Sequence, residues 1–182
     1  MSIKGKKTRI AVNGYGVIGK RLADAVMLQD DMELVGVADI ATDWRTSAAG
    51  AKGITLFGAT LDHAAAMREA GHAGVLDDLL AGSDIVVDCT PKRIAAQNVP
   101  RYREQGIKFI VHGGEKHEVT GHSFVADANY ASAVGRDSTR VVSCNTTSIV
   151  RTLSTLKRAG LLKRARGTLL RRATDPWESH QG

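Results

Sequence analysis

The sequence predicts an α/β fold with a mostly parallel sheet, because short apolar runs alternate with stretches of helical periodicity. One of these runs, Ile85–Asp88, is apolar up to its last residue, which is typical of a strand buried on both faces. Residues 16–28 follow the first apolar run and carry Val17, Leu22 and Val26 at helical spacing. The length of 182 residues suits one domain, or one domain with part of another.

The expected elements follow one another in a regular order. Strands are expected at residues 8–12, 32–38, 54–57, 85–88, 108–111, 141–143 and 166–170. Helices are expected at residues 16–28, 62–70, 77–80, 94–105 and 146–159. We expect a kink or break at Pro100, a helix end at Gly160 and a mobile loop at residues 40–53, whereas residues 119–137 show no clear pattern.

The composition limits the kinds of molecule that the protein is expected to bind. The formal net charge is +6, and residues 151–172 hold eight Lys or Arg and no acid. That stretch contains no aromatic residue on which bases could stack, so we favour phosphorylated metabolites or dinucleotides over nucleic acid. No apolar run approaches the roughly 20 residues that a membrane span needs. The two cysteines, Cys89 and Cys144, form no disulfide framework, which indicates a reducing cytoplasm.

Gly14, Gly16 and Gly19 form a G-x-G-x-x-G turn between the first strand and the first helix. Such glycines permit, in order, a tight turn, close backbone approach to a pyrophosphate, and close packing of helix on strand. Asp39 follows the second strand, where its carboxylate can accept hydrogen bonds from the adenosine ribose. The pattern predicts a Rossmann-type dinucleotide site that favours NAD, while the nearby Arg45 leaves NADP open. Glycines that serve only a tight turn are the alternative.

Cys144 lies between a predicted strand and a predicted helix. A helix N-terminus favours the thiolate, which can attack an aldehyde carbon before hydride leaves for a nicotinamide. Asn145 and the threonines that follow it suit N-capping, or the binding of an oxyanion or phosphate. Packing in the core is the alternative for Cys144 and the expected role of Cys89, whose neighbours are placed to line the nicotinamide side of a crevice.

Several blocks together resemble one family, the archaeal-type (type II) phosphorylating glyceraldehyde-3-phosphate dehydrogenases. The blocks are NGYGVIGKRLADAV, DCTPKRIAAQN, HGGEKHE, VVSCNTT followed by VRTL, and RRATDP. The resemblance runs from about residue 8 to the end and is weakest over residues 40–74. It implies a homotetrameric enzyme that oxidises glyceraldehyde 3-phosphate with NAD(P). Inorganic phosphate then releases the thioester as 1,3-bisphosphoglycerate.

The resemblance also implies roles for individual residues, with Cys144 as the nucleophile. Dinucleotide contacts are expected at Gly14, Gly16, Val17, Ile18, Gly19, Asp39, Thr90, Gly114 and Arg172. Substrate contacts are expected at Ser143, Asn145 and Thr146. No metal site is expected, because paired Cys or His spacing is missing. Residues 1–142 would form the dinucleotide-binding domain, and residues 143–182 the nucleophile segment, a helix and the incomplete start of an α+β catalytic domain.

The chain departs from the family in two respects. Asp39 stands where family members often carry a basic residue, which supports NAD here. Family members are also much longer, and their general-base histidine lies downstream; neither His112 nor His117 corresponds to it. We therefore expect a fragment, a truncated reading frame or a degenerate relative, with weak dinucleotide binding and little activity alone. A semialdehyde dehydrogenase, a dihydrodipicolinate reductase and a non-catalytic nucleotide-binding module remain alternatives.

Overall fold

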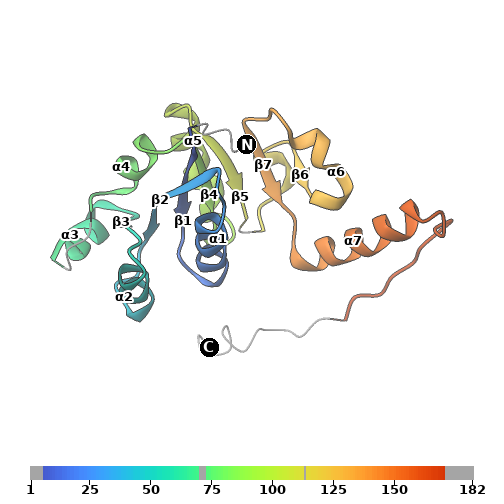
Figure 1. Ribbon diagram of the computed structural model, residues 1–182, viewed down its shortest axis with the longest axis horizontal. Helices are drawn as coiled ribbons and strands as arrows, with labels where there is room; N and C mark the ends of the chain where they lie inside the picture. The colour runs from blue at the N-terminus through green and yellow to red at the C-terminus, as the bar shows by residue number, and fades with distance from the viewer. Residues whose placement is uncertain (1–5, 70–72, 113, 171–182) are drawn as a thin grey trace.

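The computed structural model describes residues 6–69, 73–112 and 114–170. Seven strands form one sheet in the order β3-β2-β1-β4-β5-β7-β6, and every neighbouring pair is parallel (Figure 1). The strands are β1 (Thr8–Asn13), β2 (Met32–Asp39), β3 (Leu56–Gly58), β4 (Ile85–Asp88), β5 (Lys108–Val111), β6 (Ser123–Phe124) and β7 (Ser138–Val141). The predicted α/β fold with a parallel sheet is confirmed.

The helices connect these strands. They are α1 (Val17–Met27), α2 (Trp44–Ala51), α3 (Leu61–Glu69), α4 (Leu76–Ala81), α5 (Ile94–Glu104), α6 (Ala126–Ala133) and α7 (Cys144–Arg158), with a 3-10 turn, η1 (His117–Val119). None of the helices in the described part of the chain has the length and apolarity needed to cross a bilayer.

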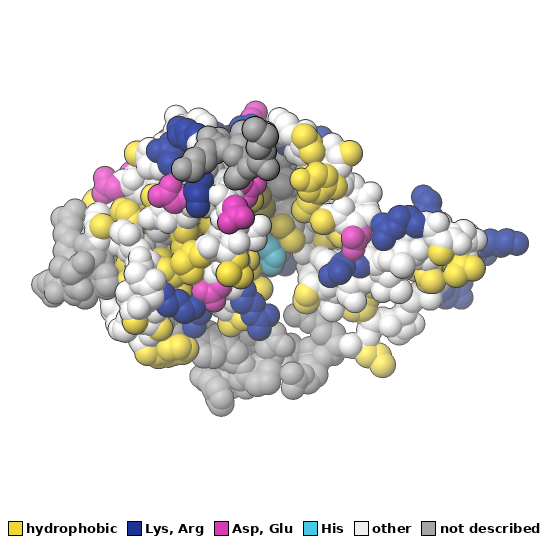
Figure 2. All heavy atoms as spheres, viewed as in Figure 1, with side chains coloured by type: hydrophobic (Ala, Val, Ile, Leu, Met, Phe, Trp, Pro, Cys, Tyr) yellow, Lys and Arg dark blue, Asp and Glu magenta, His cyan; other side chains and the backbone are white. Residues whose placement is uncertain are grey.

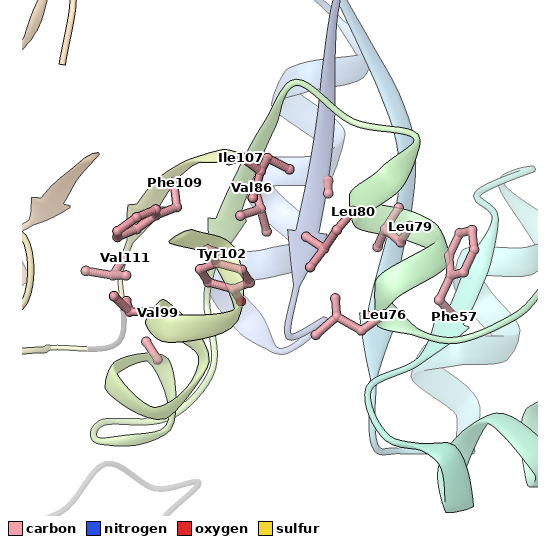
Figure 3. Close-up of a cluster of buried hydrophobic side chains, with 13 residues drawn as sticks. Phe57, Leu76, Leu79, Leu80, Val86, Val99, Tyr102, Ile107, Phe109 and Val111 are labelled. Atoms are coloured by element: carbon pink, nitrogen blue, oxygen red, sulfur yellow. The ribbon is translucent and has the colours of Figure 1, made fainter. Parts of the chain in front are cut away.

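The hydrophobic core lies on both faces of the sheet, as expected when helices cover both sides. On β1, Val12 packs in a cluster with Ala23 of α1, whereas its neighbour Ala11 packs in a second cluster with side chains of α4 and α5. Figure 3 shows the second cluster, in which Tyr102 of α5 and Leu80 of α4 point toward the sheet. Neighbouring side chains of β1 thus point to opposite faces of the sheet, one packed against α1 and the other against α4 and α5.

Helix α5 runs through Pro100 without the predicted break. Val99 and Tyr102, close to the proline on either side, are both buried in the core. Their packing holds the helix in place although the proline removes one backbone hydrogen bond. The predicted helix end at Gly160 agrees with the structure, because α7 stops at Arg158 and Gly160 has a φ of +71°.

Three sequence predictions are wrong. Residues 40–53 contain α2 instead of forming only a loop, because burial of Thr46 and Ala49 holds this segment against the core. The strand expected at 141–143 lies earlier, as β7, and pairs with β5 and β6. Residues 166–170 form no strand, since no partner strand pairs with them among the described residues, and a strand needs one to satisfy its backbone.

Helix α7 extends away from the sheet and is tied to α6 at one residue (Figure 1). Arg151 Nε donates to Asp127 Oδ2 over 3.0 Å, and a guanidinium nitrogen of Arg158 donates to the Asp127 carbonyl over 2.9 Å. Figure 2 shows basic side chains gathered over α7 and the segment after it. In the described part of the basic stretch, residues 151–170, the Lys and Arg residues are therefore exposed.

The chain order reverses between the central strands β1 and β4. From β1 the sheet continues through β2 and β3 on one side, and from β4 through β5, β7 and β6 on the other. Asn13 and Asp88 pair in register at the carboxyl ends of these two strands. Ligands of open parallel sheets bind beyond the strand carboxyl ends at such a reversal.

Candidate functional site

The glycine-rich turn after β1 has the geometry that its sequence predicts. Gly14 has a φ of +92°, and a Cβ there would lie 2.9 Å from the backbone of Cys89 and Thr90. A Cβ on Gly19 would overlap the carbonyl oxygen of Gly14. By contrast, a Cβ on Gly16 would meet no atom within 4 Å. The fold itself needs the first and third glycines, whereas the second leaves open space beside the turn.

Helix α1 begins at this turn without a side chain to cap it. Its N-cap residue is Gly16, and no acidic residue lies in its first turn. Val17 and Ile18 are exposed at the helix start. An uncapped helix N-terminus presents free N–H groups and partial positive charge, which suits a phosphate group.

Asp39, at the end of β2, is held against the same turn. Its Oδ2 accepts a hydrogen bond of 2.5 Å from the backbone N–H of Tyr15, and its Oδ1 accepts one of 2.8 Å from Ala41 N. The carboxylate is thereby fixed at the edge of the turn and keeps lone pairs for further donors. This position suits recognition of a ribose next to a phosphate bound at α1.

A buried hydrogen-bond network lies below the carboxyl ends of β1 and β4, and the sequence analysis missed it. Asp88 is fully buried, and its Oδ1 accepts from Thr90 N at 2.9 Å and Thr90 Oγ1 at 2.5 Å. Its Oδ2 accepts from Asn98 Nδ2 at 2.9 Å and from Tyr102 Oη at 2.6 Å. Asn13 Nδ2 donates to Tyr102 Oη at 2.9 Å. The signal for this network in the sequence was Asp88, an acid at the end of an otherwise apolar strand.

Cys89 lies between the turn and this network. Burial, and secondarily the charge of Asp88, raises the pKa of its thiol to about 12. It packs against the clusters on the α1 side of the sheet. The structure therefore agrees with the packing role expected for Cys89, and Thr90 beside it faces Gly14 through its backbone.

Cys144 is the first residue of α7 and is exposed. The preceding residue, Ser143, is the N-cap, since its Oγ accepts a hydrogen bond of 3.2 Å from Thr146 N and lies 2.9 Å from Thr146 Oγ1. The cap is thus Ser143 and not Asn145, which is half-buried. No acid lies in the first turn of α7. The thiol therefore sits at the N-terminus of a helix that no acidic side chain of its own first turn neutralises.

The N-termini of α1 and α7 lie at the same edge of the sheet, because all strands are parallel and each of these helices follows the carboxyl end of a strand. Three strand spacings separate β1 from β7, which corresponds to about 14 Å. The glycine-rich turn and Cys144 are therefore too far apart for one small molecule but are suited to an elongated ligand lying across β4 and β5.

The described structure does not bring the two other predicted cofactor residues, Gly114 and Arg172, together in one cluster. Gly114 is exposed after β5 with a φ of +80°. Arg172 and Gly113 lie outside the described residues. Within the part of the chain that is described, no three His, Cys, Asp or Glu side chains are grouped to hold a metal ion.

A family model described as "Homoserine dehydrogenase, NAD binding domain" matches residues 14–113, more than half of the chain. The chain belongs to this family of NAD-binding domains. Its match begins at the first glycine of the turn and runs through β5, so it covers the reversal between β1 and β4.

Curated relatives of this NAD-binding domain are named glyceraldehyde-3-phosphate dehydrogenase. The protein of Methanococcoides burtonii is 47% identical over 97% of this chain and 53% of its own length. That of Archaeoglobus fulgidus is 48% identical over 97% of this chain and 52% of its own length. The predicted resemblance to the archaeal family is confirmed, and the chain spans about half the length of the curated relatives that it matches, corresponding to their amino-terminal half.

A solved structure shares the fold over most of the chain. It is aspartate semialdehyde dehydrogenase with NADP from Candida albicans, with a TM-score of 0.59 and 13% identity. The match covers 86% of this chain and 48% of that chain. At this identity the match supports the α/β architecture alone.

Proposed function

We propose that this chain is the cofactor-binding half of an NAD(P)-dependent, phosphorylating glyceraldehyde-3-phosphate dehydrogenase, with Cys144 as its nucleophile. The observation that carries the proposal is the exposed Cys144 thiol at the N-terminus of α7, on the sheet edge that also holds the glycine-rich turn. The names of the relatives, at up to 48% identity, supply the substrate.

The residues of the turn bind the dinucleotide in this proposal. The uncapped N-terminus of α1 takes the pyrophosphate beside Gly16, where the structure leaves space. Asp39 accepts hydrogen bonds from the adenosine ribose and repels a 2′-phosphate, so NAD is favoured over NADP. Val17, Ile18, Thr90, Gly114 and Arg172 are further proposed contacts.

The chemistry takes place at the start of α7. The Cys144 thiolate attacks the aldehyde carbon of glyceraldehyde 3-phosphate, and the helix N-terminus stabilises the negative charge on sulfur before the attack. NAD, when bound, would accept the hydride that the cysteine adduct loses as it becomes the thioester. Ser143, Asn145 and Thr146 flank the substrate, and Thr146 is placed toward its phosphate. Inorganic phosphate then displaces the thiol from the thioester and yields 1,3-bisphosphoglycerate.

The chain alone is expected to bind the dinucleotide weakly and to have little activity. It spans about half the length of its curated relatives, and we propose that the general base is not among its residues. Loss of a positioned base lowers the rate by roughly 10²–10⁴-fold. For the whole enzyme we propose a homotetramer in the cytoplasm, as the resemblance implies.

Alkylation with iodoacetamide tests the nucleophile, because the chain holds only two cysteines. We expect rapid labelling of Cys144 and little labelling of Cys89, read by peptide mass spectrometry. Calorimetry with NAD tests the cofactor site on the same sample. If Cys144 is as inert as Cys89 while NAD still binds, a non-catalytic module is favoured. Robust phosphate-dependent NADH formation by this chain alone would overturn the expected low activity.

A further inference from the structure

The carboxylate of Asp88 is a buried acid with no cationic partner. It accepts four hydrogen bonds, two on each oxygen, from Thr90, Asn98 and Tyr102. None of these groups carries a positive charge, and among the described residues no ion pair involves Asp88. Four donors fill the acceptor capacity of a carboxylate, and no cation among the described residues pairs with it.

The network fixes the direction of each hydrogen bond. Tyr102 Oη donates its single proton to Asp88 and therefore accepts from Asn13 Nδ2. Asn13 Oδ1 is buried and has no hydrogen-bond partner among the described residues. Burial, and next the charge of Asp88, raises the pKa of the Tyr102 hydroxyl, so it stays a neutral donor. Thr90, Asn98 and Tyr102 thus all donate to Asp88.

Asp88 lies next to the residues that contact the proposed cofactor site. Asp88 ends β4 and pairs with Asn13 at the reversal of strand order. The following residues, Cys89 and Thr90, are those that touch the glycine-rich turn at Gly14. The carboxylate therefore lies at the carboxyl end of β4, the edge of the sheet across which the proposed function lays the dinucleotide. Buried charges act over longer distances than exposed ones because solvent screens them less.

We propose that Asp88 selects the oxidised over the reduced form of the cofactor. This inference rests on the proposed function. The oxidised nicotinamide ring carries a positive charge and the reduced ring is neutral, so a negative charge on Asp88 favours the oxidised form relative to the reduced form. A buried unit charge acting on another across a crevice changes an equilibrium constant by roughly tenfold.

The test compares dissociation constants for NAD⁺ and NADH, measured by calorimetry on the 182-residue chain. The unsubstituted chain is expected to bind NAD⁺ more tightly than NADH. Asp88→Asn, which keeps the shape and removes the charge, is expected to lower that preference about tenfold. Tyr102→Phe is the matched control: it removes a hydrogen bond of the network, keeps the charge, and is expected to leave the ratio unchanged.

Each outcome decides a separate question. If Asp88→Asn does not fold, the unsubstituted chain still tests the inference, because tighter binding of NADH than NAD⁺ would overturn it. An unchanged ratio in folded Asp88→Asn, or an equal loss in Tyr102→Phe, also overturns it. If the unsubstituted chain binds neither nucleotide, the cofactor site of the proposed function fails instead.

Discussion

The backbone N–H of Arg93 donates a hydrogen bond of 2.6 Å to Oε1 of Glu115. Arg93 is the one non-glycine residue with positive φ, +78°, among the described residues, and Glu115 is 5% exposed. The bond joins the loop after β4 to the loop after β5, the two loops that border the proposed nicotinamide side. A buried acid thus holds a strained backbone position in the candidate site.

Removal of this acceptor is expected to destabilise the chain. Glu115→Ala removes the acceptor of the Arg93 N–H, and the loss of this hydrogen bond is expected to lower the free energy of unfolding by about 1 kcal/mol. Urea denaturation followed by circular dichroism measures it. Glu118→Ala, at an exposed site in the same motif, is the control and is expected to change the free energy by less than about 0.5 kcal/mol. Equal effects of both substitutions would contradict this role for Glu115.

Alanine at two glycines of the turn is expected to have opposite consequences. Gly19→Ala brings its Cβ into the Gly14 carbonyl and should lower the free energy of unfolding by about 1–3 kcal/mol. Gly16→Ala meets no protein atom, so stability should hold while NAD binding is lost, because the methyl group occupies the space left for the pyrophosphate. Thermal unfolding and calorimetry with NAD separate the two. Retained NAD binding in Gly16→Ala would place the phosphates elsewhere.

Replacement of Asp39 is expected to shift the cofactor preference. Asp39→Ser removes the charged acceptor, so NAD should bind about 10–100-fold more weakly, while NADP gains from the loss of repulsion. Dissociation constants for both nucleotides measure the change. Asp30→Asn, an exposed acid before β2 at the opposite edge of the sheet, is the control. A constant ratio of NAD to NADP affinity in Asp39→Ser would rule out ribose recognition by this carboxylate.

His122 is expected to make stability depend on pH. Its Nδ1 lies 2.7 Å from Thr139 Oγ1 and its Nε2 lies 2.9 Å from Ser132 Oγ. Burial, and then the charges of Arg136 and His117, lower the pKa of its imidazole. The unfolded chain therefore binds the proton more readily, and stability should fall as the pH drops below the ordinary histidine pKa of about 6.5.

Urea denaturation between pH 7.5 and 5.5 tests this expectation. His122→Gln should show a shallower loss of stability than the unsubstituted chain. Some loss should remain, because burial also lowers the pKa of His112. His63→Gln, on α3, is the control and should keep the full pH dependence. The same slope in all three chains would contradict the role of His122.

The sequence predicts those features that depend on local geometry. Gly14 and Gly19 are required by a turn that spans six residues, so their spacing, together with the apolar strand before it and the helical pattern after it, predicts the turn. The position of Asp39 beside the turn was predictable for a similar reason, since this residue ends the second strand. Both kinds of signal lie within short stretches of chain.

Features that depend on distant partners were missed. The hydrogen bond from Asn13 to Tyr102 joins residues 89 positions apart, and no pattern near either residue indicates it. Helix α2 was mistaken for a loop because its burial comes from tertiary packing and not from strong periodicity. The strand expected at residues 166–170 was assigned from its composition, which does not tell whether a partner strand is present.

Because all seven strands run in the same direction, their carboxyl ends lie at one edge of the sheet and their amino ends at the opposite edge. The candidate site is at the carboxyl edge. The exposed turn at Gly106, before β5, has a φ of +64° and open space around it, on the rim opposite the candidate site. A fluorophore or affinity tag inserted there would report on the chain without touching the dinucleotide crevice. Gly106 is therefore a suitable attachment site for a label in the measurements described above.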